Sequence, residues 1–168
     1  IFKYIPNQIK SIKLEAPYNP EQGYELTVAG NNMYDVKMLA TGKSIGKTDT
    51  LAVKQFLSYF QQVNFETFED VLSQPAMDSM EKSKPINILS ITDNQGNTTK
   101  ITMFARKPKR DDTYDAAGKL VTTDPERMDA IINNNKDLVV IQYYVFGKLM
   151  PPATYFQPKS VSSPVVKK

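Results

Sequence analysis

The spacing of apolar residues changes once within the first 63 residues of this 168-residue chain, and that change limits the fold more than any other feature. Apolar and polar side chains alternate in three stretches, at residues 9–16, 24–28 and 33–40. A period of two is typical of half-buried strands. From Thr48 onward apolar residues recur three and four positions apart, which predicts an amphipathic helix over residues 49–63, capped by Thr48 or Asp49. The sequence therefore predicts an antiparallel meander of three strands followed by a helix.

The second half of the chain adds further predicted elements. Two β-rich runs, residues 86–92 and 99–105, flank a glycine-containing loop, so we expect them to form a hairpin. Residues 125–133 are expected to form a short helix, because the Asp-Pro pair at its start suits a helix cap and the first helical position. The apolar run at residues 138–146 is expected to be a central strand that is buried on both faces, at least in part.

These elements predict an α+β fold built on an antiparallel sheet of about five or six strands. The main helix, 49–63, and the shorter helix near 125–133 are expected to pack on one face, and the other face is expected to be polar. Residues 1–156 are expected to form a single domain, because a chain of this length can bury a core without disulfides or metals. Residues 157–168 are expected to be a disordered polar tail.

The Gly-Lys-Thr at residues 46–48 has the ending of a phosphate-binding loop, but its context does not fit one. The first glycine of such a loop would stand at position 41, which is Thr41, and Gly42 leaves the loop one residue short. The preceding strand carries Asp35 and Lys37, whereas the strand that leads into a phosphate loop is normally buried and apolar. We therefore expect a strand-to-helix connection and no nucleotide hydrolysis.

The chain contains no His and no Cys. This removes the usual general base near neutral pH, the Ser-His-Asp and Cys-His catalytic arrangements, disulfides and Cys-ligated metals. The acidic residues that could supply oxygen ligands do not follow the EF-hand spacing; they are Asp111, Asp112, Asp115, Asp124, Glu126 and Asp129. No metal or cofactor is predicted. The net charge is +3 and both signs are interspersed, so no nucleic-acid partner is expected.

Two groups of residues form the predicted interaction surface. They are the basic run Arg106, Lys107, Lys109 and Arg110 and the aromatic pair Tyr155 and Phe156. The basic run can touch a phosphate or a lipid head group, but the adjoining aspartates weaken its field, and a water-exposed hairpin end is the favoured interpretation. The aromatic pair follows two prolines, which must end strand pairing near Met150. We expect the pair to fold back and seal one end of the core; the alternative is an exposed patch that a partner covers.

Three segments resemble the later half of an uncharacterised family, a domain of unknown function common in Bacteroidetes. They are "IFKYIPNQIKSIKLEAPYNPEQGYELT", "DTLAVKQFLSYFQQVNFETF" and "DPERMDAIINNNKDLVVIQYYVFGKLMPPATYF". The resemblance covers most of residues 1–156. It implies an exported C-terminal portion of a precursor that carries an upstream signal or membrane anchor and a preceding half of related design. Members are associated with the cell envelope, sometimes alongside transporter components of the gliding-motility type. They have no assigned catalytic residues.

The leading functional expectation is a non-enzymatic module in the periplasm or cell envelope that binds or scaffolds another envelope protein. It rests on the resemblance and on the lack of His, Cys or a complete motif, and membrane contact is expected only through the upstream anchor. The rival expectation is a hydrolase of the glycosidase type, which works with two carboxylates across a cleft. Two buried carboxylates that face each other in a deep pocket would favour the rival.

Overall fold

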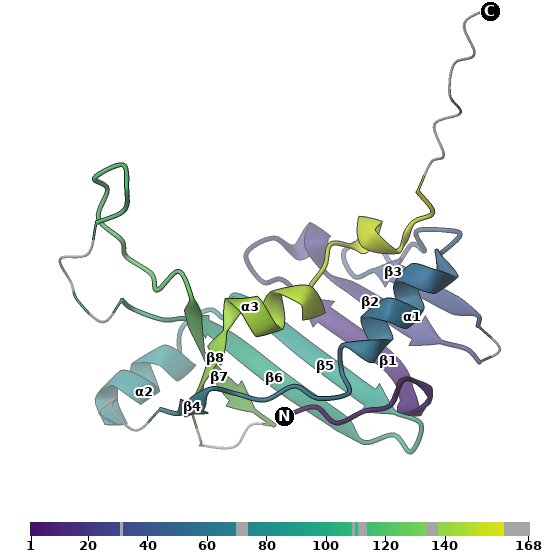
Figure 1. Ribbon diagram of the computed structural model, residues 1–168, viewed down its shortest axis with the longest axis horizontal. Coiled ribbons are helices and arrows are strands. Elements are labelled where there is room, and N and C mark those ends of the chain that lie inside the picture. Colours follow the sequence, from purple (N-terminus) through teal and green to yellow (C-terminus); the bar gives the residue numbers. More distant parts are fainter. Residues whose placement is uncertain (31, 70–73, 109, 111–113, 134–137, 160–168) are drawn as a thin grey trace, which may run out of the picture.

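The computed structural model describes residues 1–30, 32–69, 74–108, 110, 114–133 and 138–159. Within these residues, eight strands form one antiparallel sheet in the order β3-β2-β1-β5-β6-β7-β8-β4 (Figure 1). The strands are β1 (Ile9–Glu15), β2 (Tyr24–Val28), β3 (Tyr34–Met38), β4 (Thr67–Phe68), β5 (Asn87–Asp93), β6 (Thr98–Ala105), β7 (Arg127–Ile132) and β8 (Leu138–Gln142). The predicted α+β class and antiparallel sheet are confirmed, and the sheet is larger than the five or six strands expected.

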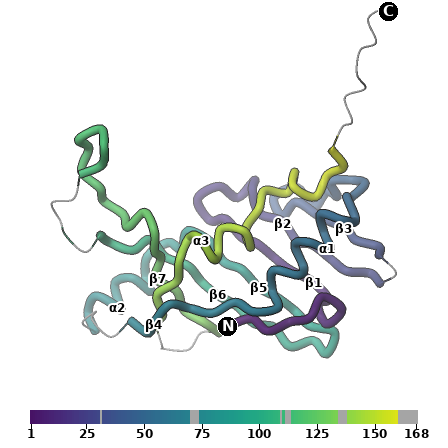
Figure 2. The backbone as a smooth tube through the Cα atoms, viewed as in Figure 1, coloured from purple at the N-terminus to yellow at the C-terminus, as the bar shows by residue number. Residues whose placement is uncertain are grey.

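Short helices and turns cover one face of the sheet (Figures 1 and 2). The helices are α1 (Thr50–Ser58), α2 (Gln74–Glu81) and α3 (Tyr143–Phe146), and the 3-10 turns are η1 (Pro6–Gln8), η2 (Pro20–Gln22), η3 (Gly147–Leu149) and η4 (Ala153–Phe156). Helix α1 and the segment from α3 to η4 lie across the sheet in Figure 1, while α2 connects β4 to β5. Helix α1 is shorter than predicted and ends at Ser58.

The connection before α1 agrees with its sequence prediction. Gly46 adopts a φ of +86°, and its N–H donates to Ser44 Oγ at 3.1 Å. The Asp49 carboxylate then accepts hydrogen bonds from the N–H groups of Leu51 and Ala52 at 2.9 and 3.1 Å. These bonds satisfy two of the amide groups that a helix leaves unpaired in its first turn. The Gly-Lys-Thr stretch is thus part of a turn and a helix cap.

The helix predicted at residues 125–133 is wrong, because residues 127–132 form strand β7. Asp124 does act as a cap: its carboxylate accepts hydrogen bonds from the N–H groups of Glu126 and Arg127 at 2.8 and 3.0 Å. The chain nevertheless continues as a strand, because β6 and β8 supply backbone partners on both sides, with Ala130 opposite Met103 and Val139. Local capping chemistry was overridden by sheet pairing.

The strand predicted at residues 138–146 is correct only over its first part. Strand β8 ends at Gln142, and Tyr143–Phe146 turn into α3. Residues 138–141 are buried, as expected for a strand covered on both faces. Strand β8 is not central, because only the two-residue strand β4 lies outside it. Of the polar tail expected at 157–168, residues 160–168 lie outside the described residues.

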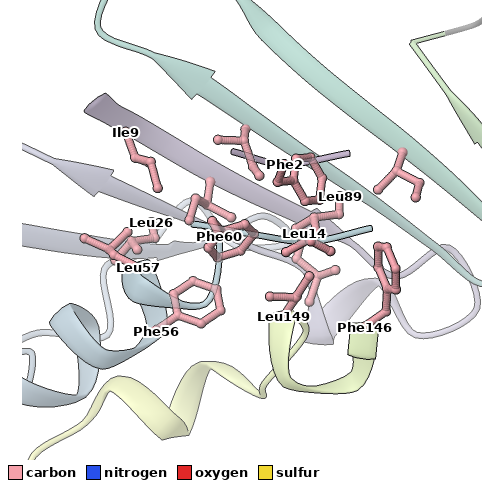
Figure 3. Packing of buried hydrophobic residues seen from close by; sticks show 14 of the residues in the cluster. Phe2, Ile9, Leu14, Leu26, Phe56, Leu57, Phe60, Leu89, Phe146 and Leu149 are labelled. Carbon is pink, nitrogen blue, oxygen red and sulfur yellow. The ribbon is translucent and has the colours of Figure 1, made fainter. Parts of the chain in front are cut away.

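An aromatic cluster fills the space between the sheet and its cover. The rings of Phe56 and Phe60 meet edge to face at 5.2 Å, and Phe2 packs on Phe60 at 5.7 Å. Figure 3 shows Leu57 of α1 beside Leu26 of β2, and Phe146 and Leu149 pointing from the C-terminal turns toward the sheet. Edge-to-face contacts of this kind add stabilisation beyond the area that they bury.

Short backbone ladders pair the outer sides of β3 and β8. Beside β3, the N–H of Met38 donates to Lys43 O and the N–H of Ile45 donates to Val36 O, each at 2.9 Å. Beside β8, the N–H groups of residues 66 and 69 donate to the carbonyls of residues 140 and 138, both at 2.8 Å. These backbone groups are already paired, so a further strand cannot easily add directly to β3 along this ladder or to β8.

Candidate functional site

The candidate site is a groove between the end of the sheet and the chain that follows α3. We call residues 147–157 the strap; in Figure 2 it runs from α3 toward β2 and β3. The strap groove has a volume of about 620 Å³, which is within the usual range for ligand sites. Its floor is Leu14 and Ala16 at the end of β1 and Met38 at the end of β3.

Two prolines set the course of the strap over the groove. Pro151 and Pro152 line its wall. Pro152 is extended, with φ −64° and ψ 154°, and η4 begins immediately after it. Because neither proline carries an N–H, this part of the strap cannot donate to a strand and bridges the sheet end without joining it. The groove is the space left under and beside this bridge.

Buried side chains fasten the strap at both ends. Leu149 is fully buried on one side of the prolines and Phe156 on the other. The Phe156 ring lies edge to face with Phe56 at 5.0 Å and with Tyr24 at 5.4 Å. The carbonyl of Phe156 also accepts a hydrogen bond from the N–H of Asp49 at 2.7 Å. The predicted fold-back of the aromatic pair is therefore seen in the structure.

The groove is mainly apolar and carries a single charged side chain among the described residues. Ile45, Met150 and Ala153 add to the apolar floor and walls. The charged residue is Glu21, an exposed residue of η2, and Gln22 lies next to it on the same rim. A surface of this composition can bind an apolar group and place one negative charge beside it. Nothing in it forms a catalytic pair.

A cluster of buried charge lies on the opposite face of the sheet. Within the described chain, the buried acidic residues are Glu69, Asp124 and Asp129. Asp129 alternates along β7 with Met128 and Ala130, which face the core, so its side chain belongs to the other face. Arg106 Nη1 forms ion pairs with the carboxylates of both Glu69 and Asp129. Arg106, which follows β6, is thus linked to Asp129 of β7 and to Glu69, which follows β4.

The pKa values of this cluster follow from burial and pairing. Burial raises the pKa of Asp129, and the neighbouring Arg106 charge only partly offsets that rise. Burial alone would lower the pKa of Arg106, but the hydrogen bonds and charges of Glu69 and Asp129 outweigh it, and the pKa is raised. Both carboxylates are therefore held by one cation, which is an arrangement typical of a structural ion-pair cluster.

The predicted interaction residues do not form one surface. Arg106 is held in the buried cluster, Lys107 and Arg110 are exposed, and Lys109 lies outside the described residues. Phe156 is fully buried, so its assignment to an exposed surface is wrong; burial against α1 and β2 is the physical reason. Tyr155 is half-buried against the same core. Strands β1 and β5 lie between β2, beside Phe156, and β6, which leads to Arg106.

Asp115 and Asp124, two of the acidic residues weighed as possible metal ligands, serve local structure. Asp115 accepts hydrogen bonds from the N–H groups of Ala117 and Lys119, both at 2.9 Å, and so shapes a turn. Asp111 and Asp112 lie outside the described residues. In the part of the chain that the structure describes, no three acidic side chains come together in a way that could hold a metal ion.

Sequence reasoning missed the strap groove and the role of Glu69. The sequence around Asp129 does indicate a buried ion pair, because an acidic residue between apolar neighbours in a strand needs a buried partner. No feature of the sequence indicates a role for Glu21, since its place on the groove rim depends on a strap more than a hundred positions away in the chain.

Comparisons with known proteins found no relative of this chain. No protein-family model, curated protein or solved structure matches the chain at a significant level. Among the described residues, no helix has the length and hydrophobicity needed to cross a bilayer. The resemblance to the Bacteroidetes envelope family stays a prediction from the sequence.

Proposed function

We propose that this domain is a non-enzymatic module of the cell envelope that binds or scaffolds a protein partner, in connection with a transporter or surface assembly. The observation that carries the proposal is the strap groove: about 620 Å³, lined mainly by apolar side chains, with Glu21 as its one charged group among the described residues. Such a lining supplies contact area and orientation but no acid–base pair.

The buried carboxylates also favour binding over hydrolysis. A glycosidase mechanism needs one carboxyl group as an acid and a second as a nucleophile or base, on either side of the scissile bond. Glu69 and Asp129 are instead both paired with Arg106, on the sheet face opposite the strap groove. Two carboxylates that share one guanidinium are held beside the same cation and do not stand on either side of a substrate cleft, as the two groups of a glycosidase must.

The cell-envelope location comes from the family resemblance alone. In the proposed precursor an upstream segment anchors the protein, and the present domain extends from it toward another envelope protein. The strap groove is the proposed docking surface for that partner.

Site-specific photo-crosslinking in the organism that encodes the protein tests this function. A photoreactive residue placed at Thr154, which is exposed and lines the groove, should trap a distinct envelope protein. The same residue placed at Thr27, which is exposed on the far face of β2, serves as the matched control. Equal capture from both positions, or none from Thr154, contradicts the proposal.

An activity measurement tests the rival function. The purified domain should not hydrolyse a panel of aryl glycosides above the level of the Asp129→Asn variant, with circular dichroism used to verify that this variant is folded. Turnover that depends on Asp129 would establish the hydrolase instead.

A further inference from the structure

Among the described residues, the strap groove is lined by one charged side chain and by several neutral polar groups. Glu21 supplies a carboxylate and forms no ion pair with the residues that the structure describes. The carbonyls of Met150 and Pro151 accept no backbone hydrogen bond from the described residues. Pro151 and Pro152 have no N–H to donate. The side chains of Gln22, Asn87, Thr154 and Gln157 can each donate or accept hydrogen bonds, so Glu21 is the lining residue that selects a ligand by its charge.

The apolar part of the groove is large enough for a bulky side chain. Leu14 and Ala16 on the floor are already nearly fully buried, whereas Met38, Ile45 and Met150 are only partly buried and present the accessible apolar surface. A ligand that covered these partly buried side chains would remove further apolar surface from water, which favours binding. The groove therefore offers an apolar seat next to one negative charge.

We propose that the strap groove binds an extended protein segment in which a Lys or Arg side chain stands next to a large apolar side chain. The apolar side chain rests on Met38 and Ile45, and the cation pairs with Glu21. This inference rests on the proposed function, since it specifies the chemistry of the protein partner. Charge complementarity selects this occupant: an acidic segment would be repelled by Glu21, and an uncharged lipid chain would leave the carboxylate unmatched.

A peptide titration followed by NMR tests the inference on the intact domain. The probes are the blocked peptide acetyl-Ala-Leu-Lys-Ala-amide and its match with Glu in place of Lys. The Lys peptide should shift the backbone amides of Ala16, Gln22 and Thr154, and it should bind more tightly than the Glu peptide. Its advantage should shrink as salt is raised, because the ion pair is exposed.

Charge variants separate the role of Glu21 from that of the apolar floor. Glu21→Gln should weaken binding of the Lys peptide by up to about fivefold, the upper end of the range for one exposed ion pair. Glu21→Lys should reverse the preference, so that the Glu peptide binds more tightly. Glu81→Gln, on an exposed position of α2 away from the groove, is the matched control and should change neither affinity.

Several outcomes would overturn the inference. Equal affinity for the two peptides would do so, as would amide shifts outside the groove or no amide shifts at millimolar peptide. Groove shifts that depend on protein concentration alone would show that a second copy of the domain is the occupant. A partner captured at Thr154 through a segment without a Lys or Arg beside an apolar residue would also overturn it while leaving the proposed function intact. Peptide preference without any captured partner would support the groove chemistry and contradict the proposed function.

Discussion

Deletion of the strap's anchor is expected to remove a large part of the domain's stability. A variant that ends at Pro152 lacks Phe156, whose side chain is fully buried and packs on Phe56 and Tyr24. The same deletion removes the carbonyl that accepts the hydrogen bond of Asp49 N–H at 2.7 Å, immediately before α1. The loss therefore affects both the core and the start of the main helix.

The magnitude follows from these two contacts. Removal of a buried Phe side chain typically costs about 3–5 kcal/mol, and loss of one hydrogen bond adds roughly 1 kcal/mol. The expected loss of about 4–6 kcal/mol compares with a whole free energy of unfolding of about 5–15 kcal/mol for typical domains. With a urea m-value of about 2 kcal/mol per M, the unfolding midpoint should fall by roughly 2–3 M.

Urea unfolding followed by circular dichroism measures this effect against a matched control. A variant that ends at Gln157 keeps Phe156 and should unfold at the same urea concentration as the full chain. Phe156→Leu, which keeps most of the side-chain volume, should lose much less unfolding free energy than the variant that ends at Pro152. If the variants that end at Pro152 and at Gln157 share one midpoint, the strap does not seal the core, and the argument from Phe156 burial fails.

Three further predictions concern individual side chains. Arg106→Met should lower the free energy of unfolding in urea by about 3–5 kcal/mol, because it leaves two buried carboxylates without their cation; an unchanged midpoint would show that the cluster is not structural. Tyr24→Phe should raise the unfolding free energy by about 1 kcal/mol, because the buried Tyr24 hydroxyl has no hydrogen-bond partner among the described residues; a loss of stability would reveal a partner. Hydrogen bonds from Asn97 hold the pKa of Asp93 below its ordinary value, so Asp93 stabilises the fold above its unfolded pKa and this contribution is lost as pH falls through the folded pKa. In an NMR titration Asn97→Ala should raise the pKa of Asp93, and an unmoved titration curve would contradict that assignment.

Much of the first half of the fold could be predicted from the sequence alone. The strands at 9–15, 24–28 and 34–38 and the helix that begins at Thr50 lie where the hydrophobic period places them. The cap at Asp49 was also expected. These features are local, since the spacing of apolar residues and a capping side chain act over a few positions.

Prediction failed where a local signal competed with long-range pairing. The Asp-Pro pair at 124–125 has the chemistry of a helix start, and Asp124 does cap the chain, yet residues 127–132 pair with strands on both sides. The apolar run at 138–146 divides into a strand and a helix because β7, its partner, begins at Arg127 opposite Gln142. One more bond follows, from the N–H of Tyr143 to Glu126 O at 2.9 Å, and α3 then begins.

By itself the sequence determined the α+β class, the early strands and helix, and the absence of His and Cys chemistry. Only the tertiary structure placed Phe156 in the core, joined Glu69 and Asp129 through Arg106, and brought Glu21 to the rim of the strap groove. The physical reason is the distance along the chain over which each kind of interaction acts. Periodicity and capping are encoded within a few residues, whereas a groove or a buried ion pair depends on segments that are far apart in the chain and become neighbours only when the whole sheet has formed.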